Sequence, residues 1–278
     1  MTLRRSEKFA ILASCLPLIL LLHLAPPAAA QQSSSTILPQ LMNAQAGNMP
    51  LHSIFLTGTV SGPNGSGATS GTVSLNASSH QWSQVALQTP SGNQTEIRNG
   101  SGLYHIRMST GIDGVPHTTE MTDLKLPHPA WFSPSFVLLS GLASPKYWSA
   151  DLGTQTWKGS TVSHVAIWQR VPSNLPASVA ALAQQQTQTD VYLDPSTLLP
   201  VAMTFHVQID PQNPNEIIVP QNATGNVLVE VDFSNYRSIQ GSQIPFHVQV
   251  LNGSSVLLDI NISSATINAG ETTAAVSD

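Results

Sequence analysis

The chain has 278 residues, of which 41% are hydrophobic and only 9% are charged, and its formal net charge at pH 7 is -5. Because no basic cluster follows the first ten residues, the sequence lacks the electrostatic footprint of a nucleic-acid-binding protein. A chain of this length can bury about three quarters of its unfolded surface in a hydrophobic core. Its polar surface must come mainly from Ser, Thr, Asn and Gln.

Residues 1–30 have the pattern of a secretory signal peptide. Basic residues precede an apolar stretch that ends in small residues, which predicts cleavage between Ala30 and Gln31. Two alternatives stay open. A retained membrane anchor would be nearly long enough to span a bilayer, although the Pro26-Pro27 pair disfavours a continuous helix. The tetrapeptide that ends at Cys15 also resembles the lipobox at which bacterial lipoproteins are cut and acylated.

Cys15 is the single cysteine of the chain, so the exported part would contain no disulfide and must be stabilised by its core. The leader holds three basic residues and one acidic residue, and its removal therefore leaves a more acidic chain. No break in composition divides the rest. We predict one half-barrel domain over residues 36–268, between a mobile leader at 31–35 and a mobile tail at 269–278.

The first part of the exported chain predicts one short helix and then a meander of strands. The helix, over residues 36–46, would begin near Pro39 and stop at Gly47. Short apolar segments separated by Gly-, Asn- and Ser-rich turns then indicate antiparallel strands. These strands are expected at residues 54–60, 71–77, 82–88, 95–99 and 103–108.

Residues 111–129 carry three prolines and no periodicity, so we expect a long irregular connection there. A helix over residues 131–142 should follow, because Pro134 is well suited to a first helical turn. Apolar residues at helical spacing would form its buried stripe, which consists of Phe132, Phe136, Leu139 and, at its margin, Val137.

A strand is expected at residues 161–170 and a further helix at 174–186. In this helix, Asn174 would be the N-cap and Pro176 would lie in the first turn. Its apolar face would consist of Val179, Leu182 and Ala183.

The C-terminal part shows the cleanest alternation. Met203, Phe205 and Val207 would point to one face of a sheet, while His206 and Gln208 point to the other. Such a sheet is apolar on one face and hydrated on the other. The strands are expected at residues 189–193, 199–209, 226–236, 244–251 and 255–267, with tight hairpin turns at Gln240-Gly241 and Asn252-Gly253.

No pattern in the sequence predicts an active site. Neither a Gly-x-Ser-x-Gly nucleophile elbow nor a His-Glu-x-x-His zinc motif occurs. His206 and His247 are expected to be solvated side chains that could be cross-strand neighbours. Glu230 and Asp232 would face solvent, and nothing pairs carboxylates for glycoside hydrolysis. We therefore predict a non-enzymatic protein with no metal and no cofactor.

Several short motifs follow one another in the C-terminal strands: an Asp before Leu-Pro, then Phe-Ser-x-Tyr, then Gly with Ile-Pro-Phe, and last Ile-Asn. They resemble the outer-membrane lipoprotein-sorting family of LolA-like fold. In physical terms, Gly241 permits a turn, and Pro245 starts a strand at a place where no backbone N–H is needed for pairing. Tyr236 can bury its ring while its hydroxyl stays in contact with water. The residues are Asp194, Leu199-Pro200, Phe233, Ser234, Tyr236, Gly241, Ile244-Pro245-Phe246 and Ile267-Asn268.

The resemblance implies an α+β, mostly β fold, in which a strongly curved antiparallel sheet forms an incomplete half-barrel covered by two or three short helices. It also implies that acyl chains are held between the sheet and the helices. The apolar lining would then include Phe136, Leu139, Met203, Phe205, Val229, Val231, Phe233, Phe246 and Val248. The chain departs from the family in its weak first helix and in the lack of an arginine that we could assign to acyl gating.

The resulting hypothesis is a periplasmic or secreted protein that binds a lipid, an acyl chain or a lipoprotein, as a carrier or an envelope sensor. We expect a monomer that touches membranes only transiently, unless Cys15 is acylated and anchors it to the outer membrane. The alternative is a structural or adhesive β-sandwich of the cell envelope, whose apolar face is simply its core. An open apolar cavity would distinguish the two.

Overall fold

The computed structural model describes residues 37–47, 51–63, 68–79, 82–101, 104–110, 112–122, 130–143, 147–170, 174–209, 217–220 and 223–268. The predicted signal peptide, its cleavage site between Ala30 and Gln31, and the predicted leader and tail segments at 31–35 and 269–278 lie outside these residues. None of the described helices is both long and apolar enough to cross a membrane.

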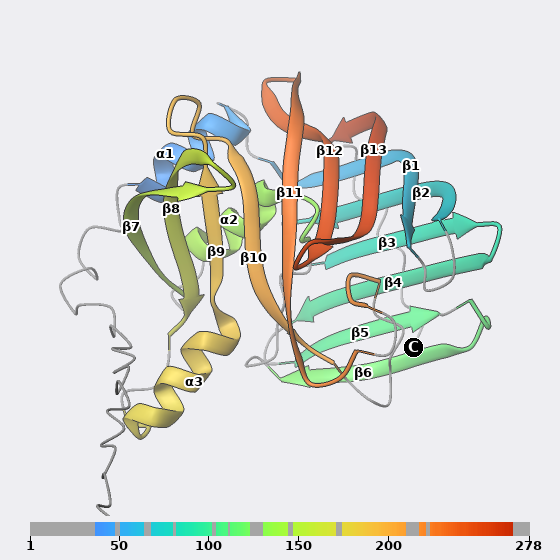
Figure 1. Ribbon diagram of the computed structural model, residues 1–278, viewed down its shortest axis with the longest axis horizontal. Helices are drawn as coiled ribbons and strands as arrows, with labels where there is room; N and C mark the ends of the chain where they lie inside the picture. Colours follow the sequence, from blue (N-terminus) through green and yellow to red (C-terminus); the bar gives the residue numbers. More distant parts are fainter. Residues whose placement is uncertain are drawn as a thin grey trace, which may run out of the picture.

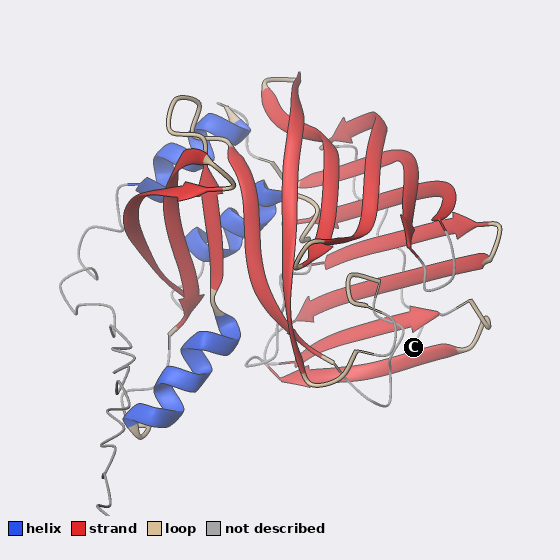
Figure 2. Ribbon diagram, viewed as in Figure 1, coloured by secondary structure: helices blue, strands red, loops and turns tan. Residues whose placement is uncertain are grey.

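Thirteen strands form one antiparallel sheet (Figures 1 and 2). Their order across the sheet is β6-β5-β4-β3-β2-β1-β13-β12-β11-β10-β9-β8-β7. The first half of the sheet contains β1 (Ser53–Pro63), β2 (Ala68–Ser78), β3 (Trp82–Thr89), β4 (Gly92–Ser101), β5 (Tyr104–Thr110) and β6 (Pro116–Thr122). The second half contains β7 (Tyr147–Trp157), β8 (Ser160–Gln169), β9 (Thr189–Leu193), β10 (Pro200–Gln208), β11 (Asn226–Ile239), β12 (Ser242–Asn252) and β13 (Ser255–Ile267).

The first and last strands of the chain meet in the middle of this sheet. From β1, hairpins lead outward to the β6 edge; the chain then crosses to the opposite edge and returns from β7 to β13. Helix α2 (Pro134–Ala143) lies on the crossing, where it packs against α1 (Ile37–Ala46) and β7. Helix α3 (Ala177–Thr187) connects β8 and β9. The strands turn strongly between the two halves, so the sheet is curved (Figure 1).

The alternation predicted for the C-terminal strands is confirmed. Met203, Phe205 and Val207 are at most 2% exposed, whereas Gln208 on the other face is exposed. Because side chains alternate along a strand, these residues extend one core across β10 to β13 and into β1 and β2. The curved antiparallel sheet with a few short helices that the sequence predicted is therefore present.

Local turn chemistry supports the hairpin predicted at Gln240-Gly241, whereas the turn predicted at Asn252-Gly253 lies one residue later, since Asn252 ends β12 and pairs with Ser255. Gln240 and Gly241 connect β11 to β12 with φ angles of 50° and 91°, the positive values that a two-residue hairpin of type I′ needs. Asp194 stabilises the turn before β10, because its Oδ1 accepts hydrogen bonds from the backbone N–H groups of Ser196 and Thr197. The Ser196 hydroxyl also donates to this carboxylate, and these bonds lower the pKa of Asp194.

The Tyr236 hydroxyl differs from the prediction. It is not left to water but donates a 2.7 Å hydrogen bond to the Pro200 carbonyl oxygen of β10, and burial raises its pKa well above the usual range. Pro245 also lies inside β12 instead of starting it, opposite Tyr236. The β12 pairing with β13 begins only at His247, so Pro245 costs no hydrogen bond on that side.

Two strands between residues 111 and 160 were not predicted. The segment expected to be irregular contains β6, and β7 follows α2. Both are edge strands, and such strands need no continuous apolar face. The sequence PHTTEMT of β6 is mostly polar, and most side chains in the second half of β7 are exposed, so apolar alternation gave no signal for either strand.

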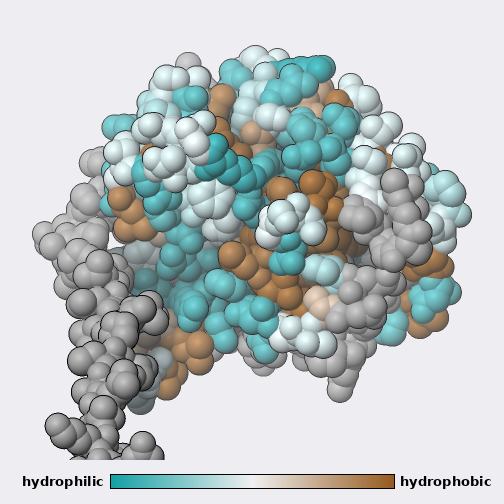
Figure 3. All heavy atoms as spheres, viewed as in Figure 1, coloured by the Kyte–Doolittle hydropathy of each residue, from teal (hydrophilic) through white to brown (hydrophobic). Residues whose placement is uncertain are grey.

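The packing predicted for the third helix was right for Ala183 but wrong for Val179 and Leu182. Its N-cap is Pro176, without a side-chain cap, and not Asn174. Val179 and Leu182 are 46% and 53% exposed, and only the small Ala183 and Thr187 are buried toward β8 and β10. Thr187 anchors this end, because its Oγ1 accepts a hydrogen bond from the Gln169 backbone N–H. Figure 3 shows several exposed hydrophobic areas, in brown, among hydrophilic surface, in teal.

Candidate functional site

The predicted lining residues lie together on the apolar face of the sheet. Met203 of β10 pairs with Val231 of β11, Phe205 pairs with Val229, and Phe233 pairs with Val248 of β12. Together with Phe136 and Phe246 they belong to one core cluster, and each is at most 4% exposed. Leu139 lies in α2, but its side chain is outside the described part of the structure.

The helices contribute residues that the lining prediction omitted. Leu41 of α1 and Trp131, just before α2, are 0% exposed and belong to the same cluster. The ring of Trp131 meets that of Phe132 edge to face, with centroids 5.5 Å apart. Trp131 precedes the predicted helical stripe of Phe132 and Phe136, and helical spacing therefore gave no signal for it. The apolar face is thus covered by two helices and by the turn that leads into α2.

The contact between α1 and α2 also contains buried polar groups. The Ser135 hydroxyl donates a 2.9 Å hydrogen bond to Gln45 Oε1, and both residues are at most 2% exposed. At the end of α1, the Ser242 hydroxyl of β12 donates to the Ala46 carbonyl oxygen. These bonds fix the position of α1 relative to α2 and to the sheet.

A buried polar patch interrupts the apolar face on β3 to β5. It consists of Ser83, Glu96, Arg98 and Ser109, all at most 4% exposed. The register places Glu96 between Val85 of β3 and Ser109 of β5, in the same row as the core residues Leu56 and Leu75. Arg98 Nε lies 2.6 Å from Glu96 Oε1 and donates a hydrogen bond to it.

A segment of the β10–β11 connection packs over this patch. The Ile217 backbone N–H donates to the second carboxylate oxygen of Glu96 at 3.3 Å, and the next residue, Ile218, is 0% exposed. The carboxylate therefore binds one partner on its own strand and one 121 residues away in the chain. Charges on alternate residues of a strand usually indicate a solvated face, which is why the sequence did not reveal this buried ion pair.

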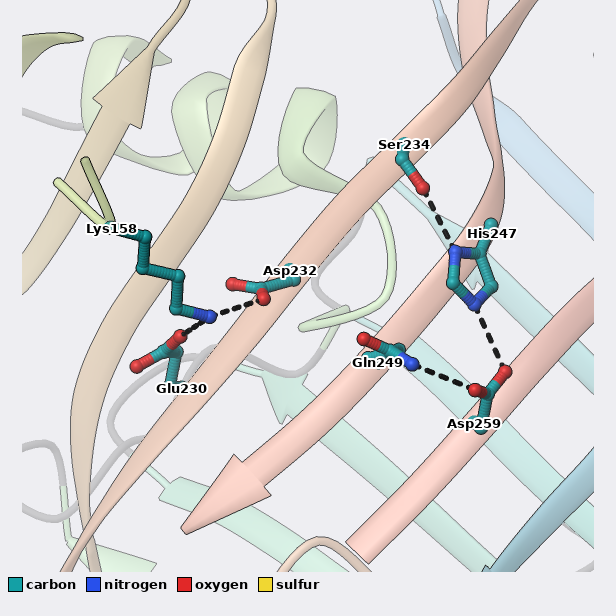
Figure 4. A network of polar contacts seen from close by, with 7 residues as sticks. All are labelled: Lys158, Glu230, Asp232, Ser234, His247, Gln249 and Asp259. Carbon is teal, nitrogen blue, oxygen red and sulfur yellow. Dashed lines mark hydrogen bonds and ion pairs between the residues drawn. The ribbon is translucent and has the colours of Figure 1, made fainter. Parts of the chain in front are cut away.

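On the outer face, the turn between β7 and β8 reaches across the sheet. Lys158 Nζ lies 2.5 Å from Asp232 Oδ2 of β11 and also contacts Glu230 (Figure 4). Burial alone would lower the pKa of Lys158, but its hydrogen bonds to the two carboxylates outweigh burial and raise it. Burial raises the pKa of Glu230 despite the opposing bond to Lys158. Glu230 and Asp232 thus face outward as predicted, but they are paired.

Aromatic stacking holds the same hairpin. The ring of Trp157 stacks on Tyr192 of β9, with centroids 3.9 Å apart and an interplanar angle of 16°. His164 stacks on the same tyrosine, and its Nε2 lies 2.8 Å from Asp190 Oδ1. Burial raises the pKa of Tyr192. The β7–β8 hairpin is therefore fixed to the outer face by ring contacts and by one lysine.

Replacing Lys158 with methionine should lower the free energy of unfolding by about 0.5 kcal/mol, because this half-exposed pair is screened by solvent. The stability of the wild-type protein should also fall more with added NaCl than that of Lys158→Met. Urea unfolding at low and high salt measures both effects. Ser160→Ala, on the same hairpin, is the control and should keep the wild-type salt dependence; equal salt dependence of all three proteins would contradict the prediction.

A second outer network joins β11, β12 and β13 (Figure 4). The Ser234 hydroxyl lies 2.8 Å from His247 Nδ1, and His247 Nε2 lies 3.0 Å from Asp259 Oδ1. The amides of Gln249 and Asn261 also donate to Asp259. If Nε2 carries the proton toward the carboxylate, Nδ1 accepts from the serine, so one tautomer satisfies the whole chain of bonds.

This order of Ser, His and Asp is that of a catalytic relay, but its setting differs. Ser234 lies inside a strand, directly paired with His247, and not on a sharp strand-to-helix turn. We interpret the network as a cross-strand tie. The predicted neighbourhood of His206 and His247 is wrong, since His206 pairs with Leu228 of β11 and that strand separates β10 from β12. In the part of the chain that is described, no three metal-ligating side chains gather.

Comparison with known proteins agrees with this architecture. The fold is similar to that of a DUF1329-family protein from Desulfovibrio piger, with a TM-score of 0.51, 10% identity, and coverage of 85% of this chain and 92% of the other. For an outer membrane lipoprotein-sorting protein domain from Vibrio parahaemolyticus, the TM-score is 0.49 and the identity 11%, and the match covers 85% of this chain and 93% of the other. For a LolA superfamily protein from Nitrosomonas europaea, the TM-score is 0.48 and the identity 9%, and the match covers 86% of this chain and 94% of the other.

No family model matches the chain, and no curated protein sequence matches it. At 10% identity, the likeness to a solved structure shows the fold alone. The fold that the resemblance implied, one curved antiparallel sheet with a few short helices, is confirmed at this level.

Proposed function

We propose that the protein is an exported, non-catalytic binder of a lipid, an acyl chain or an acylated protein, held between the sheet and helices α1 and α2. The observation that carries this proposal is the convergence of apolar side chains from β10, β11 and β12 with Phe136 on one curved face. Such a face, covered by two short helices and a turn, suits an elongated apolar ligand. The resemblance of the C-terminal motifs to the lipoprotein-sorting family supports the same function.

The proposal includes the route of the protein through the cell. Cleavage between Ala30 and Gln31 would release one domain, residues 36–268, into the periplasm or the medium as a monomer. Acylation of Cys15 would instead anchor the chain to the outer membrane. Mass spectrometry of the intact protein from its host distinguishes the two, because each process leaves a different N-terminal residue and mass.

The protein purified from its native host should contain a bound lipid that organic extraction and mass spectrometry identify. After delipidation, added fatty acid or lipopeptide should raise the melting temperature, because a ligand that binds only the folded state stabilises it. A protein that carries no lipid and shows no thermal shift with either ligand would contradict the proposal. An unrelated β-protein taken through the same extraction controls for carried-over membrane lipid.

The burial of the lining favours one alternative. Every described residue of the predicted lining is at most 4% exposed, as expected if the apolar face is filled by the helices alone. The protein would then be a structural or adhesive component of the cell envelope without a small ligand. The same extraction separates the two functions, because a filled core returns no lipid.

A further inference from the structure

The first half of helix α3 extends beyond the strands on which the helix packs. Ala183 and Thr187 are buried toward β8 and β10, and Val179 stands one turn before Ala183 on the same side of the helix. Val179 is nevertheless 46% exposed. The side that packs on the sheet therefore continues past it, and Figures 1 and 2 show α3 projecting from the body of the molecule.

This projecting end, residues 174–182, carries large apolar side chains. Every residue from Asn174 to Val179 is exposed, and so is Leu182. Leu175, Val179 and Leu182 thus lie in water, although proteins usually bury such residues. Single exposed leucines are common on protein surfaces, but three large apolar side chains gathered at one projecting end mark a contact surface.

The charge pattern restricts what the projecting end contacts. No charged residue occurs between Arg170 and Asp190, although the whole chain has a formal net charge of -5. This segment therefore has no charge with which to attract an acidic or a basic partner, and a strongly anionic surface would repel the protein as a whole. In turn, no ionised group of the segment has to leave water when the segment enters an apolar layer.

The small area of the projecting end favours a lipid surface over a protein partner. Specific protein complexes bury about 800 Å² on each side. Three side chains at a convex end supply only a fraction of that area, whether the partner is another protein or a second copy of this chain. A lipid layer needs no complementary shape, and a helix can enter its interface because the helix satisfies its own backbone hydrogen bonds.

We propose that the projecting end of α3 inserts Leu175, Val179 and Leu182 into the interface of a lipid bilayer, and that it is the element through which the folded protein touches a membrane. The helix has 11 residues, too few to cross a bilayer, so it lies in the interfacial layer. Insertion of a few apolar side chains without basic residues gives weak and reversible binding. The inference goes beyond the proposed function, since it needs no ligand at the inner apolar face.

Co-sedimentation of the exported protein with sucrose-loaded vesicles measures the contact. Wild-type protein should bind phosphatidylcholine vesicles at least as well as vesicles that also contain phosphatidylglycerol, and high salt should not release it. Leu182→Ser should weaken binding about tenfold, because it removes a leucine side chain from the apolar layer. Leu228→Ser removes a similarly exposed leucine from β11 and is the control, which should bind as wild type does. No binding to either vesicle, or equal losses in the two variants, would contradict the proposal.

A fluorescent label locates the inserted segment. An NBD group attached to Ser178→Cys, in the projecting end, should shift its emission to the blue when phosphatidylcholine vesicles are added, because the probe leaves water. The same group on Ser160→Cys, at the turn between β7 and β8, is the control and should keep its emission. Equal emission changes at the two positions would overturn the inference.

Sedimentation velocity without lipid distinguishes a membrane contact from a contact between two copies of this chain. Wild-type protein and Leu182→Ser should both be monomers. A wild-type dimer that Leu182→Ser dissociates would show that the projecting end joins two copies, and the inference would be wrong. Vesicle binding by a protein that carries no extracted lipid would support the inference and contradict the proposed ligand, so the two proposals fail separately.

Discussion

Substituting Gly58 by valine is expected to destabilise the fold by about 3 kcal/mol, as overpacking does where no side chain can move aside. Gly58 lies in β1 where this strand pairs with β13, and the register shifts between Thr57 and Gly58. A Cβ atom at Gly58 would stand 2.1 Å from the Asn261 carbonyl oxygen. That atom belongs to the backbone of the neighbouring strand, so the clash separates the two strands.

The position explains why the effect should be large. The pairing of β1 with β13 is the seam that joins β2–β6 to β7–β12, because the chain begins and ends its sheet there. Urea unfolding followed by circular dichroism measures the loss. Thr59→Val, an exposed change on the next residue of the same strand, is the control and should change stability by less than about 0.5 kcal/mol. Wild-type stability of Gly58→Val would show that the close approach is not needed.

The sequence predicted the C-terminal strands well because each of them has one apolar and one polar face. Phe205 and Val231 lie where period-two alternation places them, and Gly241 has the positive φ that its turn requires. The same rule missed β6 and β7, since an edge strand can be polar on both faces. Alternation thus recognises strands by their burial and not by their hydrogen bonds.

The contacts that complete the site depend on tertiary structure. Lys158 meets Asp232 across 74 positions of the chain, and Ile217 meets Glu96 across 121. No local pattern links such residues. The apolar lining could be predicted from single strands, whereas the polar groups beside it required the register of the sheet. Cleavage after Ala30 and ligand binding at the lining residues stay predictions.

Removing the charge of Arg98 should be among the most damaging single changes, and the position of Arg98 in the sheet gives the reason. The side chains of Arg98 and Glu96 are 5% and 1% exposed, so each charge is stabilised by the other and not by water. Arg98→Met keeps most of the buried length of the side chain but takes from the Glu96 carboxylate its charged partner, while the backbone donor of Ile217 stays in place. Breaking a buried pair on one side typically costs about 3–5 kcal/mol.

The double variant Glu96→Gln/Arg98→Met tests whether the cost comes from the charge left behind or from lost packing. The glutamine side chain is neutral and could still accept the hydrogen bond from Ile217, so the double variant should recover most of the stability, to within about 1–2 kcal/mol of wild type. Urea unfolding of the two variants and of Glu96→Gln alone completes a double-mutant cycle. If Arg98→Met and the double variant are equally unstable, packing around the guanidinium and not charge pairing stabilises this end of the sheet.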